Sequence, residues 1–167
     1  MTAPIEIAHG KLRALHRFWE SLRPAPDLLP GRQHFQAEDI WPWVGHIGMV
    51  DVERGGQKDT PFRFRIRLRG GHLVRLTGNG RPSLYLDETL QTKYRGFVLD
   101  QHRDAAATGM PVYRIQLDEA KPWKRIDRLV LPFASDGHTI DLLMTGLYMA
   151  VTPPQPCRAS SQGQNST

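Results

Sequence analysis

The sequence predicts a single α/β domain in which helices cover both faces of a five-stranded sheet. Stretches with the two-residue period of a strand occur five times. Stretches with the helical period precede the first strand and separate the second from the third. The last strand is apolar on both faces, which indicates a central position with both sides of the sheet covered. A chain of 167 residues has the length of one such domain.

The first expected element is an amphipathic helix over residues 8–23. Its apolar stripe, with spacings of three and four residues, consists of Leu12, Leu15, Trp19 and Leu22. A helix of this length is marginal alone in water, so we expect the stripe to be buried against the outer sheet face or a second copy of the chain. Prolines from Pro24 onward end the helix, and residues 37–46 read as a short helical passage.

Two strands follow, over residues 46–53 and 62–69, with a glycine-bearing hairpin loop between them. The second strand alternates strictly, so its two rows of side chains are expected on opposite faces of the sheet. The row expected to face the core is Phe62, Phe64, Ile66 and Leu68. The row expected to be solvated is Arg63, Arg65, Arg67 and Arg69.

The rest of the chain alternates between helical and strand periods. Helices are expected at 71–78 and 92–109, the longer one ending on Gly109 as a C-cap, and strands at 111–119, 123–133 and 139–151. Residues 152–167 are rich in proline, serine and glutamine and are expected to be disordered. The expected divisions are a flanking helix with its linker at 1–35, a core at 36–151 and the tail.

Several motifs, in the right order, resemble a family of small stand-alone bacterial PAS proteins. They are "LRALHRFWESLR", "RFRIRLRGGHLVRLTG" with a following "YLDE", "TGMPVY" and "RLVLPFASDGHTIDLLMTG", and they span roughly residues 10–150. The resemblance implies an antiparallel sheet in the order 2-1-5-4-3, with short helices between strands 2 and 3 and a flanking N-terminal helix. It also implies a sensory or protein-interaction module, with a homodimer and an unknown signalling protein as expected partners.

PAS domains hold their ligands between the inner sheet face and the short helices. The resemblance therefore implies a pocket for a small apolar or amphipathic ligand, with these candidate lining residues: Phe64, Ile66, Leu73, Leu76, Leu86, Phe97 and Met144. The alternative is that these side chains simply fill the core. Flavin–cysteine photochemistry is excluded, because the single cysteine, Cys157, lies in the tail. Haem is not favoured, since only His72 and His102 are positioned to ligate it.

The PAS strand order would place the arginine-bearing strand at a sheet edge. Arginines on an edge strand discourage another chain from pairing with it, and this is the explanation we favour. Ion pairs with Asp51 and Glu53 on the neighbouring strand are a second explanation. A third is a nucleic-acid-binding protein that uses this face, because six arginines and no acidic residue lie between Asp59 and Asp87. No aromatic alternates with the arginines to stack bases, so we rank nucleic-acid binding below edge protection and keep it as the alternative function.

The remaining features point away from catalysis and from a membrane. The sequence contains no phosphate-binding loop, nucleophile elbow or paired metal-ligand motif, so neither an enzyme nor a metal site is expected. It has no apolar run of membrane-spanning length and no secretory signal pattern. One cysteine and a net charge of +5 are compatible with a cytoplasmic protein, which is the expected location.

Overall fold

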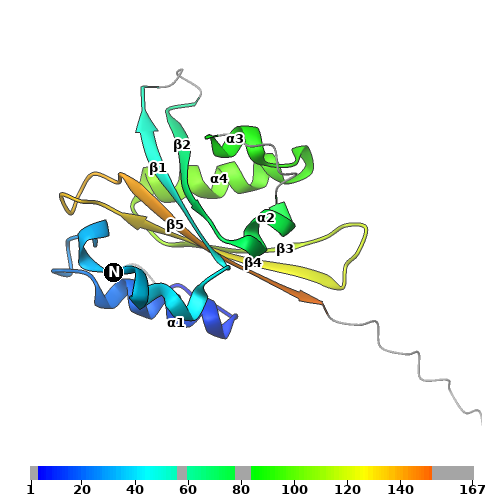
Figure 1. The fold of residues 1–167 in the computed structure, drawn as a ribbon, viewed down its shortest axis with the longest axis horizontal. Helices are drawn as coiled ribbons and strands as arrows, with labels where there is room; N and C mark the ends of the chain where they lie inside the picture. The colour runs from blue at the N-terminus through cyan, green and yellow to red at the C-terminus, as the bar shows by residue number, and fades with distance from the viewer. Residues whose placement is uncertain (1–3, 56–59, 78–83, 152–167) are drawn as a thin grey trace, which may run out of the picture.

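The computed structural model describes residues 4–55, 60–77 and 84–151, and it contains one antiparallel sheet in the order β2-β1-β5-β4-β3. The strands are β1 (Ile47–Arg54), β2 (Phe62–Arg69), β3 (Val112–Leu117), β4 (Lys124–Phe133) and β5 (Leu142–Val151). This order confirms the predicted one, with β5 in the centre and β2 and β3 at the edges (Figure 1). The expected disordered tail and Cys157 lie outside the described residues.

The helices form two layers on opposite faces of the sheet. The helix α1 (Gly10–Ser21) lies on one face, while α2 (Gly71–Thr77), α3 (Leu86–Thr89) and α4 (Thr92–Thr108) lie on the other (Figure 1). Gly109 ends α4 in the left-handed conformation with φ 66°, as predicted. Two 3₁₀ helices, η1 (Arg32–His34) and η2 (Ala37–Trp43), connect α1 to β1. None of the described helices is long and apolar enough to cross a membrane.

The α1 stripe is buried against the sheet within the chain itself. Leu12 and Leu15 are fully buried, and Trp19 Nε1 donates a hydrogen bond of 2.8 Å to the carbonyl of Pro132 on β4. Leu22 is partly buried at the edge of the same cluster. Gly146 on β5 allows this close approach, because a Cβ there would lie 2.7 Å from methyl groups of Leu12 and Leu15. The stripe therefore has its partner surface without a second copy of the chain.

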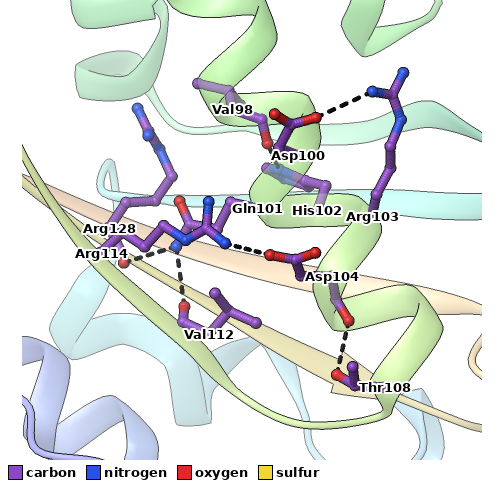
Figure 2. A network of polar contacts seen from close by, with 10 residues as sticks. All are labelled: Val98, Asp100, Gln101, His102, Arg103, Asp104, Thr108, Val112, Arg114 and Arg128. Carbon is purple, nitrogen blue, oxygen red and sulfur yellow. Dashed lines mark hydrogen bonds and ion pairs between the residues drawn. The ribbon is translucent and has the colours of Figure 1, made fainter.

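On the opposite face, α4 is fixed to the sheet by apolar packing and by Gln101. Val98, Leu99 and Ala105 of α4 belong to the buried cluster on this face. The Nε2 atom of Gln101 donates hydrogen bonds of 3.0 Å to the carbonyls of Val112 on β3 and Arg128 on β4 (Figure 2). One fully buried side chain thus ties the helix to two strands.

A bulge in β2 breaks the alternation that its sequence shows. Met49 of β1 pairs with Leu68, whereas the next residue, Val50, pairs with Ile66, so Arg67 is an extra residue in β2. Residues beyond a bulge are displaced by one position and change faces. Leu68 therefore shares the outer face with Met49 and is 43% exposed, while Arg69 turns to the inner face. The prediction that Leu68 faces the core and Arg69 the solvent was wrong for this reason.

Candidate ligand cavity

A small cavity lies between the inner face of the sheet and the helices α2, α3 and α4, where the resemblance placed a pocket. Its volume is about 40 Å³. Most of its wall is apolar, with residues from the sheet and from all three helices: Met49, Val50, Ile66, Leu68, Leu73, Leu86, Leu90, Val98 and Leu147. Four polar residues also line it: Arg69, His102, Arg128 and Thr145. The polar residues decide what the cavity can bind.

Arg128 is the most unusual of the four. It lies on β4 between Arg114 of β3 and Leu147 of β5, and only 1% of it is exposed. Neither Nη1 nor Nη2 has a hydrogen-bond partner among the described residues, and Figure 2 shows its guanidinium without a contact line. Burial lowers the pKa of Arg128 to about 10, which still leaves it cationic at neutral pH. A buried cation without a counter-ion is energetically costly.

Arg69 joins Arg128 at the cavity because of the bulge in β2. The side chain of Arg69 is partly buried, and its Nη2 atom is buried without a hydrogen-bond partner in the described part of the chain. Desolvation by burial lowers the pKa of Arg69. Two guanidinium groups therefore line a space of about 40 Å³, and none of the described lining residues carries a carboxylate.

His102 of α4 is a neutral hydrogen-bonding residue in the wall. Its Nδ1 lies 2.8 Å from the carbonyl oxygen of Val98, which can only accept, so this nitrogen carries the proton. Nε2 then accepts the hydroxyl hydrogen of Thr145 across 3.0 Å. Burial lowers the pKa of His102 to about 4, and the nearby Arg128 contributes to the decrease.

These contacts do not fit haem, for which His72 and His102 were the positional candidates. Both ring nitrogens of His102 are occupied, and a cavity of about 40 Å³ is far below the roughly 300–1,000 Å³ of pockets for drug-sized ligands. His72 is not in the cavity wall; its ring is stacked on that of His46 with centroids 4.2 Å apart. Among the described residues, no cluster of His, Cys, Asp or Glu could hold a metal ion.

The structure brings together only some of the predicted pocket residues. Ile66, Leu73 and Leu86 line the cavity. Phe64 is buried beside it with its ring 5.5 Å from His102, and Leu76 packs near Leu73. Phe97 is outside the lining, 5.8 Å from the Arg128 guanidinium. Met144 lies on the opposite face, in the cluster under α1, because β5 is apolar on both sides and its sequence does not show which row faces inward.

Two of the other arginines of β2 have carboxylate partners within the chain. Arg63 lies 2.5 Å from Glu88 and 3.6 Å from Asp87. Arg67 lies 2.9 Å from Asp51, and this pair is the one that the ion-pair hypothesis expected. Glu53 instead accepts the hydroxyl hydrogen of Tyr85 at 3.1 Å. All these arginine contacts are partly exposed, so solvent screens them and they contribute little to stability.

The chain also covers part of the outer edge of β2. The backbone N–H of Ile66 donates a hydrogen bond of 2.6 Å to the carbonyl of Leu84, and Arg65 forms an isolated antiparallel bridge with Tyr85. These backbone contacts protect a stretch of the edge in addition to the charges that the sequence placed there.

Comparison with protein-family models found no matching family, and comparison with curated proteins found no match.

Proposed function

We propose that this chain is a cytoplasmic PAS-type sensory or protein-interaction domain without catalytic activity of its own. The observation that carries the proposal is the cavity between sheet and helices, which is lined by the buried Arg128, whose Nη atoms have no hydrogen-bond partner among the described residues. The sheet order and the position of the helices agree with the PAS arrangement that the sequence motifs resemble. A buried charge without a function would be a cost, since an apolar side chain could fill the same space.

The strand that carries Arg128 connects the cavity with the outer face of the sheet. Its neighbour Asp127 points to the opposite face, where Arg125 binds its carboxylate in two hydrogen bonds of 2.7 and 2.8 Å. Trp19 of α1 is hydrogen-bonded to the same strand at Pro132. A ligand that changes the position of Arg128 would therefore act on β4 and, through it, on α1.

The output would pass through a partner protein or a homodimer. Because the α1 stripe is buried within the chain, a homodimer would need another surface. One such surface is the sheet edge formed by β3, where Ile115 is 43% and Leu117 58% exposed. We include a homodimer through this edge in the proposal.

The alternative of nucleic-acid binding has less support from the arginine face. Arg63 and Arg67 have carboxylate partners, and Arg69 lines the cavity, so the four arginines do not form one continuous row. Binding through this face would weaken steeply with rising salt. We keep it as an outcome of the test below.

The test is to ask whether a ligand alters the protein beyond the cavity. Native mass spectrometry and absorption spectra of the purified chain would reveal a co-purified ligand. Hydrogen exchange and sedimentation, each with and without ligand, would then report on α1, β3 and the oligomeric state. Changes at α1 or β3 support the proposal. A ligand-bound protein with unchanged exchange outside the cavity and an unchanged oligomeric state would contradict it, and salt-sensitive DNA or RNA binding would favour the alternative.

A further inference from the structure

We propose that the cavity binds a small monovalent carboxylate of about the size of formate or acetate, with Arg128 and Arg69 as its cationic partners. This inference rests on the proposed function only in taking the same cavity as the sensing site. It names the class of ligand as a small carboxylate. The resemblance implied only a small apolar or amphipathic ligand.

The charges around Arg128 leave it without compensation. Its cross-strand neighbour Arg114 has a carboxylate partner in Asp104, and Asp100 on the same helix is 3.3 Å from Arg103 (Figure 2). Asp127 faces the other side of the sheet, where it binds Arg125. The aromatic ring of Phe97, 5.8 Å from the guanidinium, offers only weak compensation. Each described acidic group near Arg128 is therefore already paired or faces away.

The second guanidinium strengthens the inference. Both guanidinium groups line the same space, and an anion there would accept their N–H groups and offset their charge. A water molecule could accept a hydrogen bond from either arginine but could not neutralise the charge. The hydroxyl of Thr145 already donates to His102, so among the described side chains of the wall the donors without a partner are those of the two arginines.

The size and the apolar wall limit the kind of anion. A cavity needs about 10–15 Å³ to hold one water molecule, so a cavity of about 40 Å³ accommodates a group of about three or four heavy atoms. The planar fork of a guanidinium matches the two oxygens of a carboxylate. The methyl group of acetate would contact the apolar wall, which includes Ile66, Leu73 and Leu86. Sulfate and hydrogen phosphate carry two charges and more oxygens, which the apolar wall would leave without partners.

The test measures anion binding to the full chain, prepared in a buffer without small carboxylates and held at constant ionic strength with a bulky sulfonate. Formate and acetate are titrated by calorimetry and by melting temperature, and ¹³C-formate is followed by NMR. Pivalate is the control ligand, because it has the same charge and a group too large for the cavity. We expect saturable binding of formate or acetate near one per chain, and no saturable response to pivalate.

Two variants separate the cavity from general charge. Arg128→Met should lower the affinity for formate at least tenfold and, without anion, should melt no lower than the native protein, because it removes an uncompensated buried charge. Arg114→Met is the matched control: it removes an arginine from the adjacent strand position, beside the same Phe97 ring but paired with Asp104. Its affinity should stay within about twofold to threefold of native, since it does not line the cavity.

These binding experiments test the carboxylate ligand independently of the proposed sensory function. No saturable formate or acetate binding by the native protein, an equal response to pivalate, or an equal loss in Arg114→Met would overturn it. If Arg128→Met does not fold, the native ¹³C-formate signal and its weakening in Arg69→Met decide instead. A neutral ligand in the cavity that alters α1 or β3 would leave the sensory proposal standing and refute the carboxylate. Carboxylate binding without any change outside the cavity would support the carboxylate ligand and contradict the sensory proposal.

Discussion

Arg128 on β4 and Arg114 on β3 are directly opposed across the strands, and of the two only Arg114 has a carboxylate partner, Asp104, among the described residues. Like charges in directly opposed positions destabilise a sheet. Asp104 compensates the charge of Arg114, whereas the charge of Arg128 has no described carboxylate partner and lies at the cavity.

The first prediction concerns this compensation. Asp104→Asn should destabilise the fold by no more than about 1 kcal/mol, because the pair with Arg114 is partly exposed and screened by solvent. The loss should shrink as salt rises, since the remaining effect is repulsion between two arginines. Urea unfolding at low and high salt measures it. A loss that does not depend on salt would show that Asp104 acts through packing.

The second prediction tests the bulge in β2. Phe64→Ala should cost about 3–5 kcal/mol, because Phe64 is 2% exposed and packs in the core beneath α4. Leu68→Ala should cost less than about 1 kcal/mol, since the bulge turns Leu68 to the exposed side. Arg65→Ala is a solvated control that should cost about 0.5 kcal/mol or less. Equal urea midpoints for the Phe64 and Leu68 variants would mean that the strand alternates without a bulge.

The third prediction tests the contact between α1 and the sheet. Gly146→Ala should destabilise the protein by about 1–3 kcal/mol, because the added Cβ would lie 2.7 Å from the methyl groups of Leu12 and Leu15. Gly96→Ala in the interior of α4 is the control: its Cβ would meet nothing within 4 Å, and alanine favours a helix by up to about 1 kcal/mol. Melting temperatures should therefore move in opposite directions. A shift of the same sign in both would refute the close packing of α1.

The fourth prediction concerns the pH dependence of stability through His102. Its pKa is about 4 in the folded state, mainly through burial, against 6.5 for an ordinary histidine. The unfolded chain therefore binds the proton first as pH falls. The stabilising effect of the neutral ring is complete above pH 6.5 and is lost progressively toward pH 4, by about 3 kcal/mol in all.

The variant His102→Gln isolates this contribution from the other titrating groups. His9, His16 and His72 also have lowered pKa values, so the native protein loses stability from several sites as pH falls. The difference in unfolding free energy between native and variant should therefore narrow between pH 6.5 and 4. A constant difference across this range would show that His102 does not titrate as its burial implies.

The sequence predicted the architecture but not the polar part of the cavity. The strand order, the α1 stripe and the Gly109 cap followed from local periods and the family resemblance, and all are present. The bulge could not be predicted, because residues 62–69 alternate without interruption. Arg128 had one weak signal: it shares its row on β4 with the apolar Ile126 and Val130. The opposite row, with Leu129 and Leu131, is equally apolar, so periodicity alone does not assign the arginine to the inner face.

The last prediction returns to the arginines at the edge of β2. The bulge reduces the solvated set to Arg63, Arg65 and Arg67, of which the first and last are held by Glu88 and Asp51. Replacing all three with valine should leave an uncharged and strongly β-prone edge strand, and the variant should self-associate in sedimentation velocity at concentrations where the native protein does not. The triple lysine variant is the control, because it keeps the positive charge and should sediment like the native protein. Backbone contacts of Leu84 and Tyr85 cover the edge at Ile66 and Arg65, so association should be partial and concentration-dependent. If the valine variant stayed in the native oligomeric state, this backbone cover alone would be enough to protect the edge, and the arginines would need another explanation.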